Sequence, residues 1–250
     1  MGQRRSPLGV ADLERVAARG WRALEEEPLG DWLLRAGGGF TGRANSVLVA
    51  GDPGLPLADA VDAVGRWYAE RGIAPCAQLP GVQARAADAA FAAAGWARDE
   101  DVHVLTAPLT APPAPDVPVD LSPVPDDAWL AGYRHRGRPL PPTAREVLVN
   151  AERVAFASVR LAPAPAPLAA VGRGVLVDGW LGVSAVTVAE EHRRQGLATA
   201  VMAALQRWAG EHDAHSVYLQ VTTSNAPART LYRRAGFIEH HRYHYRRLPG

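Results

Sequence analysis

The stretch VTVAEEHRRQGLA, residues 186–198, joins an apolar strand-like segment to the start of a helix. Apolar residues recur along one face of the helix predicted over residues 196–210, at Leu197, Val201, Ala204, Leu205 and Trp208. The first backbone N–H groups of a helix have no partner inside it, and the helix dipole adds partial positive charge there. The local sequence therefore predicts an anion-binding site between a strand and a helix.

Four residues of this stretch suit a bulky phosphate ligand. Gly196 lets the backbone approach the anion closely, and Ala198 keeps the next turn uncrowded. Arg193 and Arg194 add charge-assisted donors that match phosphate oxygens. A pyrophosphate fits this chemistry best. The pattern Arg-x-x-Gly-x-Ala is weakly specific by itself, and a solvated helix start with two surface arginines is the alternative.

The sequence downstream makes the stretch more specific. Asn225 precedes Pro227, a residue typical of a helix start. Tyr232 lies within the helix predicted from Pro227, which Gly236-Phe237 closes. The whole arrangement, over roughly residues 117–250, resembles the GNAT superfamily of acetyl-CoA-dependent N-acetyltransferases.

This resemblance implies a role for each matching residue. The backbone of Val186 and Val188 would pair with the pantetheine arm of acetyl-CoA, and the Val188 N–H would face the thioester carbonyl oxygen. Asn225 would bind the pantetheine region, and Tyr232 would lie beside the sulfur and protonate the departing thiolate. A core aromatic residue is the alternative for Tyr232. The pyrophosphate would be held by Arg193, Arg194, Gln195, Gly196, Leu197, Ala198 and Thr199.

The resemblance predicts direct transfer of an acetyl group from acetyl-CoA to a small-molecule amine or a protein amino group. A general base cannot be assigned, because residues 184–188 hold no carboxylate. Asp178 is interpreted as a hairpin-turn residue, and Glu190 and Glu191 as solvated charges. A non-catalytic CoA-binding sensor or scaffold is the alternative function.

The chain divides at a proline-rich segment, residues 109–118, which is predicted to be a linker. Residues 1–108 and 119–250 show the same order of strand, helix, strand, helix and strand. The predicted fold is α+β (mixed α/β), with tandem GNAT-like halves that each form a mixed, mostly antiparallel sheet flanked by helices. The second half, 119–250, is the predicted catalytic domain.

The first half lacks the phosphate-binding loop. Its equivalent segment, AGDPGLPL at residues 50–57, has an aspartate, two prolines and no arginine. Proline removes N–H donors, and a carboxylate repels phosphate. We expect a degenerate copy that helps to complete the acceptor pocket. Arg35, Arg43 and Asn45 are its polar candidates, with fold-supporting surface residues as the alternative.

Composition excludes several other classes. The 250 residues carry a net charge of +1, which gives no basis for nucleic-acid binding, and no apolar run reaches the roughly eighteen residues of a membrane helix. All 27 basic residues are arginine, and the single Cys76 is expected to be a buried thiol, as in a cytoplasmic protein. His240, His241 and His244 are interpreted as a solvated or partner-facing strand, and no metal is expected. A monomer or a homodimer is expected.

Overall fold

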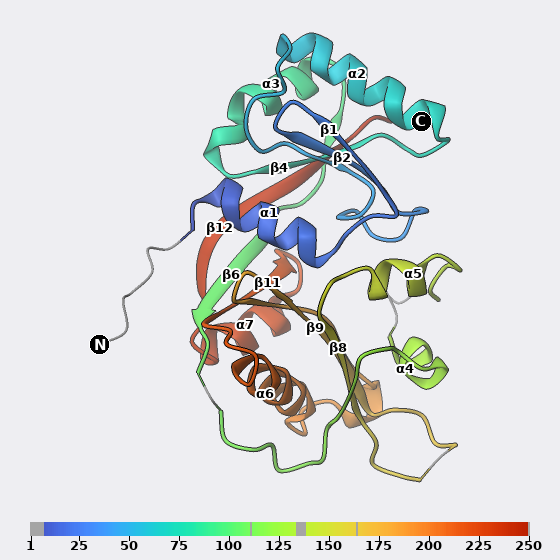
Figure 1. The fold of residues 1–250 in the computed structure, drawn as a ribbon, viewed down its shortest axis with the longest axis vertical. Coiled ribbons are helices and arrows are strands. Elements are labelled where there is room, and N and C mark those ends of the chain that lie inside the picture. The colour runs from blue at the N-terminus through green and yellow to red at the C-terminus, as the bar shows by residue number, and fades with distance from the viewer. Residues whose placement is uncertain (1–7, 111, 134–138, 164, 250) are drawn as a thin grey trace.

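The computed structural model describes residues 8–110, 112–133, 139–163 and 165–249. One mixed, twelve-stranded sheet runs the length of the molecule, with helices packed against both of its faces (Figure 1). The strands follow the order β1-β2-β3-β4-β12-β6-β11-β10-β9-β8-β7, and β5 pairs with β12 outside this path. The predicted α+β class, with a mostly antiparallel mixed sheet, is confirmed.

The first half of the chain forms the upper lobe in Figure 1 together with the C-terminal strand. Its strands are β1 (Glu25–Leu29), β2 (Trp32–Ala36), β3 (Val47–Leu48), β4 (Cys76–Pro80), β5 (Ala97–Arg98) and β6 (Val102–Pro108). Its helices are α1 (Val10–Gly20), α2 (Leu57–Glu70), α3 (Arg85–Ala93) and the 3-10 turn η1 (Val82–Ala84).

The second half forms most of the lower lobe. Its strands are β7 (Asp120–Ser122), β8 (Val154–Val159), β9 (Ala170–Val177), β10 (Trp180–Val188), β11 (Ser216–Thr222) and β12 (Ile238–Arg247). Its helices are α4 (Asp127–Gly132), α5 (Ala144–Val149), α6 (Leu197–Gly210), α7 (Ala226–Arg234) and the 3-10 turn η2 (Glu190–His192). The two predicted helices occur as α6 and α7, and Asp178 lies in the turn between β9 and β10, as predicted; α4 and α5 were not predicted. The described residues of the proline-rich segment 109–118 form no helix or strand.

The last strands of the two halves are exchanged. β6, from the first half, pairs along its whole length with β11, antiparallel. β12, from the second half, pairs antiparallel with β4 on one side and with β6 on the other. In Figure 1 the green β6 descends into the lower lobe, and the red β12 rises into the upper one. The sheet therefore continues from one half into the other.

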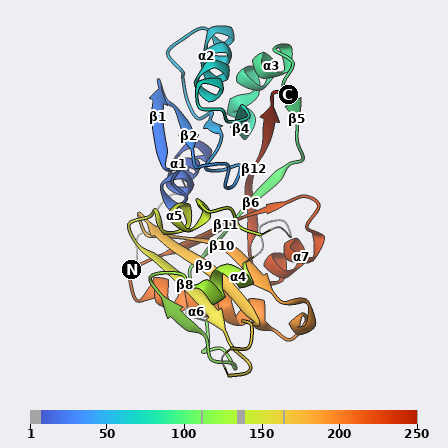
Figure 2. The same ribbon diagram turned by 90° about the vertical axis from the view of Figure 1, so that its right-hand side faces the viewer.

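The helices cover the sheet unequally. α6 packs tightly on β9, because Gly172 and Gly174 carry no side chain that would collide with Val201 and Leu205. α1 crosses the opposite face, as Figures 1 and 2 show, and its Leu13 is fully buried. α2 and α3 enclose a separate apolar core on the first half. Cys76 is fully buried in β4, as expected.

Candidate active site

The sheet opens between β10 and β11. These parallel strands pair from Trp180↔Ser216 to Val183↔Leu219, and their pairing ends there. On the other edge of β10 the pairing with β9 shifts between Ser184 and Thr187, at a bulge where Ala185 has φ 56°. A bulge bends its strand away from its neighbour. We call the gap between residues 184–188 of β10 and 220–222 of β11 the open seam.

The backbone of β10 presents a donor to this seam. The N–H of Ala189 donates to the Ala169 carbonyl oxygen at 2.9 Å, on the β9 side. Successive N–H groups along a strand point to opposite edges. The Val188 N–H therefore points away from β9 and toward the open seam.

A cavity of about 290 Å³ occupies the seam. Two of the elements that line it, the loop before β3 and the strand β6, belong to the first half, and the exchanged β12 lines it as well. The lining residues are Thr41, Gly42, Arg43, Val102, Tyr133, Val183, Ser184, Ala185, Val186, Leu219, Gln220, Val221, Thr222, Asn225, Ala228, Tyr232, Tyr243 and Tyr245. Val186, Asn225 and Tyr232, chosen from the sequence, are thus brought together in one pocket.

Tyr232 projects from the middle of α7. Its ring lies 5.8 Å from that of Phe237, and it packs against the core beneath α6 that also includes Val186 and Val188 at its margin. Burial raises the pKa of the Tyr232 hydroxyl to about 12. A phenol of this pKa stays protonated at neutral pH, so Tyr232 is a hydrogen donor there.

Asn225 is the N-cap of α7. Its Oδ1 accepts from the Ala228 N–H at 3.2 Å, which satisfies one of the free N–H groups of the helix. Asn225 is exposed, and its side-chain N–H groups donate no hydrogen bond to another described residue, so they remain available to a ligand. The cap uses only the oxygen of the side-chain amide and leaves its nitrogen unused.

The glycine loop precedes α6 and lies outside the cavity lining. Gly196 is the N-cap of α6 with φ 80°, a left-handed conformation that favours glycine, and Arg194 has φ 62°. An added Cβ at Gly196 would meet nothing within 4 Å, so the approach to the helix start is open. Arg193 is exposed and forms a 3.5 Å ion pair with Glu190. Gln195 donates to the Glu191 carbonyl oxygen at 3.4 Å.

The first helical N–H groups of α6 belong to Leu197, Ala198 and Thr199. No side chain of the described residues caps the helix start, and the first helical hydrogen bond runs from the Ala200 N–H to the Gly196 carbonyl oxygen at 3.0 Å. These groups are the unpaired donors that the sequence predicted. The side chain of Leu197, the first residue of α6, is buried in the core, so only its backbone faces the loop.

Two of the acceptor candidates do not reach the cavity. Arg35 is buried and donates to the Ser46 carbonyl oxygen at 2.9 Å and to Gln78 at 2.7 Å. Asn45 is buried too and holds the loop before it through Gly37 and Gly39. Interpreting them as surface residues is therefore wrong, because both hold the interior of the first half together.

Arg43 does line the cavity. Its Nη1 donates to the Gln220 Oε1 at 2.9 Å, and the Tyr243 hydroxyl donates to the same oxygen at 3.3 Å. Its guanidinium lies 4.3 Å from the centroid of the Trp21 ring. The first half thus contributes a charged side chain to a pocket built mainly by the second.

The sequence analysis missed Arg173 and Ser184. They lie opposite each other in the β9–β10 pair, and Arg173 is completely buried. Arg173 Nη2 and Ser184 Oγ have no hydrogen-bond partner among the described residues. The signal in the sequence was an arginine between two glycines, Gly172 and Gly174, inside an otherwise apolar strand.

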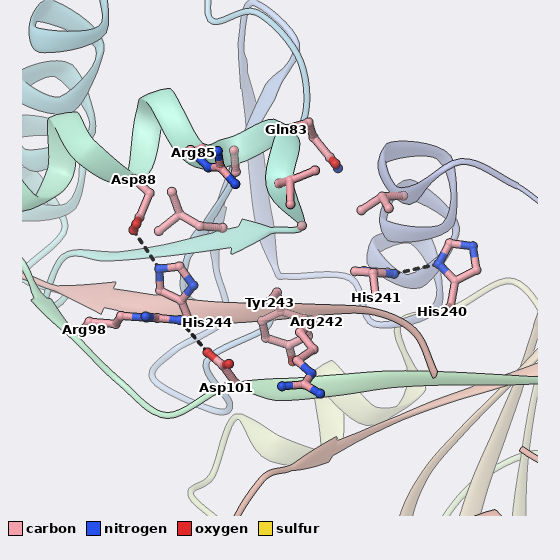
Figure 3. A pocket seen from close by; sticks show the side chains of 15 residues that line it. Gln83, Arg85, Asp88, Arg98, Asp101, His240, His241, Arg242, Tyr243 and His244 are labelled. Carbon is pink, nitrogen blue, oxygen red and sulfur yellow. Dashed lines mark hydrogen bonds and ion pairs between the residues drawn. The ribbon is translucent and has the colours of Figure 1, made fainter. Parts of the chain in front are cut away.

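A second cavity lies between α3 and β12, and Figure 3 shows three pairs of interacting side chains among the residues that line it. His244 lies 2.7 Å from Asp88, and Arg98 lies 2.7 Å from Asp101. His240 contacts His241 at 2.8 Å. These internal pairs make the cavity a poorer candidate for the reaction site.

β12 is not the solvated strand that its histidines suggested. It lies in the middle of the sheet, and His241 is buried, 2.8 Å from the carboxylate of Glu14. No group of three or more potential metal ligands occurs among the described residues. None of the helices among the described residues has the length and apolar character needed to cross a bilayer.

Comparisons with known proteins identify the family of this chain. A family model described as "Probable histone acetyltransferase Rv0428c C-terminal" matches residues 9–246. The uncharacterized N-acetyltransferase YobR of Bacillus subtilis is 27% identical over 95% of this chain and 98% of its own. The probable histone acetyltransferase Rv0428c of Mycobacterium tuberculosis is 30% identical over 96% of this chain and 74% of its own.

Solved structures share the fold. A GCN5-related N-acetyltransferase from Kribbella flavida superposes with a TM-score of 0.68 at 18% identity, covering 96% of each chain. A tandem GNAT protein from the clavulanic acid biosynthesis pathway reaches a TM-score of 0.58 at 16% identity, covering 77% of this chain and 69% of its own. The chain belongs to the family described as probable histone acetyltransferase Rv0428c C-terminal, and it is an acyl-CoA-dependent acetyltransferase with the GNAT fold.

Proposed function

We propose that the chain transfers an acetyl group from acetyl-CoA to a primary amine, directly and within a ternary complex. The observation that carries this proposal is the open seam, where β10 and β11 separate over a cavity that collects Val186, Asn225 and Tyr232. An unpaired strand edge suits an extended arm that adds as a further strand. GNAT acetyltransferases use acetyl-CoA as co-substrate and act on amine acceptors.

The residues present fit the donor. The start of α6 offers unpaired N–H groups, open space beside Gly196 and the side chains of Arg193 and Arg194, which together suit a pyrophosphate. From there, residues 186–188 of β10 lead toward the cavity. In this proposal the loop at residues 193–199 holds the phosphates, and Val186 and Val188 bond the pantetheine arm, as Asn225 does with its free amide N–H.

The chemical step involves three groups: the acceptor amine, the Val188 N–H and the Tyr232 hydroxyl group. The nitrogen of the neutral amine attacks the thioester carbon, a C–N bond forms, and the C–S bond breaks. In the proposal the Val188 N–H donates to the carbonyl oxygen, which gains negative charge during the attack. Tyr232 gives its proton to the departing thiolate, because it is protonated at neutral pH. The proton released by the nitrogen restores the phenol through solvent.

No residue is assigned as general base. The described residues that line the cavity include no aspartate, glutamate or histidine. Asp178 lies in the β9–β10 turn with φ 49° and pairs with Arg19, as expected for a turn residue. Glu190 pairs with Arg193 in the loop. An amine that is already partly neutral at the working pH suits such a pocket best.

The test is to incubate the protein with acetyl-CoA and a panel of primary amines, and to measure both the released CoA thiol and the mass of the product. Cys76 is fully buried, so it contributes little background to a thiol reagent. We expect acetylated amine in a one-to-one ratio with CoA. Tight binding of acetyl-CoA without product from any amine would instead support the alternative, a non-catalytic CoA-binding sensor.

A further inference from the structure

Arg43 has no anionic partner among the residues that the structure describes. Its contacts are the side-chain oxygen of Gln220 and the ring of Trp21, both uncharged. None of the ion pairs between described residues involves Arg43. It is also the one residue with a formal charge among the described residues that line the cavity. A half-buried guanidinium without a counter-ion loses hydration that its protein contacts only partly replace.

The guanidinium of Arg173 strengthens the positive potential around Arg43. Arg173 is completely buried, and its carbon Cζ lies 4.8 Å from the centroid of the same Trp21 ring. It donates only to backbone carbonyl oxygens, of Leu148 at 2.8 Å and of Gly20 at 3.0 Å. Burial lowers the pKa of Arg173 to about 9, and the charge of Arg43 adds to the decrease. Arg173 therefore stays charged at neutral pH, and neither arginine has a carboxylate partner among the described residues.

Ser184 adds an unused polar group. Its Oγ is buried in the wall of the cavity and lacks a partner among the described residues. Ser184 and Arg173 are directly paired on neighbouring antiparallel strands, so their side chains lie on the same face of the sheet. The cavity lining thus combines the positive charge of Arg43 with a free hydroxyl group, and the second positive charge, on Arg173, lies outside the lining beside the same tryptophan.

We propose that the acceptor carries a carboxylate in addition to its amine, and that Arg43 binds this carboxylate. The inference rests on the proposed function, and it names the substrate class: an amino acid, or a compound with the same two groups. A guanidinium fork matches two carboxylate oxygens, and Ser184 can donate a further hydrogen bond. The phosphates of CoA do not supply this anion, because residues 189–199 do not line the cavity.

Matched acceptors test this in the wild-type protein. Each amino acid, for example L-alanine or 4-aminobutyrate, is compared with its own carboxamide by kcat/KM for CoA release. We expect the carboxylate form to be preferred about tenfold or more, the size of one charged hydrogen bond. The preference would run against intrinsic reactivity, because a nearby carboxylate keeps the ammonium protonated. Equal values, or preference for the carboxamides, would overturn the inference.

Variants assign the preference to Arg43. Arg43→Gln should remove it by raising KM for the carboxylates about tenfold or more, while activity with the carboxamides persists and reports a folded enzyme. Arg43→Lys should restore part of it. Arg160→Gln is the matched control: Arg160 is half-buried, donates to the Ala166 carbonyl oxygen at 2.6 Å and lies outside the cavity. An equal loss for both members of each pair in Arg43→Gln would show a structural role and overturn the inference.

The failure of the proposed function has a different signature. If no amine, with or without a carboxylate, released CoA from the wild-type protein, both proposals would be overturned. If carboxamides and simple amines reacted as well as amino acids, only the assignment of the acceptor would be lost.

Discussion

Tyr218 occupies the space in which a side chain at Gly182 would lie. The two residues are paired on the parallel strands β10 and β11, and an added Cβ at Gly182 would come within 3.0 Å of both the ring and the hydroxyl group of Tyr218. The hydroxyl group also lies 2.8 Å from where a Cβ at Gly20, the last residue of α1, would be. This tight layer ends one residue before the strands separate at the open seam.

The layer predicts the effect of a single methyl group. Gly182→Ala should lower the free energy of unfolding by about 1–3 kcal/mol, because the core must shift to accept it. Gly65→Ala is the control: Gly65 lies inside α2, and an added Cβ there meets nothing within 4 Å. It should raise stability by roughly 0.5–1 kcal/mol. Urea unfolding of both variants checks this, and equal effects would contradict it.

Tyr232→Phe should lower turnover at least about tenfold, the contribution expected from one general acid, while the affinity for acetyl-CoA stays nearly the same. The ring contact with Phe237 does not need the hydroxyl group. Because the pKa of Tyr232 is about 12, ionisation of this phenol should not reduce wild-type turnover below about pH 11. Steady-state kinetics at saturating acceptor measures both effects. Unchanged turnover would remove Tyr232 from the mechanism.

Gly196→Glu should weaken CoA binding by about tenfold, because it places a carboxylate at the positive end of α6. Gly95→Glu is a matched control at the end of α3. Both glycines have nearly the same φ, 80° and 83°, and open space around an added Cβ. Both variants should therefore suffer similar backbone strain. Calorimetric titration with CoA should separate them, and a similar loss in both would count against the phosphate assignment.

Asp88 should make stability depend on pH. Partial burial raises the pKa of Asp88, but hydrogen bonds from Arg246 and His244 outweigh this, and the net shift is downward. A lowered folded-state pKa contributes stability above the unfolded value of about 4, and that contribution is lost as the pH falls through the folded value. Asp88→Asn should therefore destabilise the protein more at pH 7 than at pH 3.

Urea unfolding at the two pH values tests the role of Asp88. Asp62→Asn provides the control, because Asp62 is exposed on α2 and forms no ion pair with another described residue. Its effect should stay within about 0.5 kcal/mol at both pH values. A loss for Asp88→Asn that is as large at pH 3 as at pH 7 would contradict the assignment.

Local sequence patterns predicted the elements well. The glycine loop at 193–196, the helix after it and the N-cap Asn225 each depend on contacts within a few residues, so their signals are contiguous in the chain. The same locality explains why β12 was misinterpreted. Polar histidines indicate a solvated strand only if no buried carboxylate faces them, and Glu14, which faces His241, is contributed by α1.

The sequence by itself determined the order of helices and strands, the unpaired amides ahead of Leu197 and the residues that carry the family resemblance. Only the tertiary structure decided that β6 and β12 change places, and that Arg43 and the buried Arg173 flank one tryptophan beside the cavity. The reason is physical. A helix bonds to itself, whereas a strand edge offers the same N–H and C=O groups to any neighbour, so its partner is selected by the packing of the whole molecule.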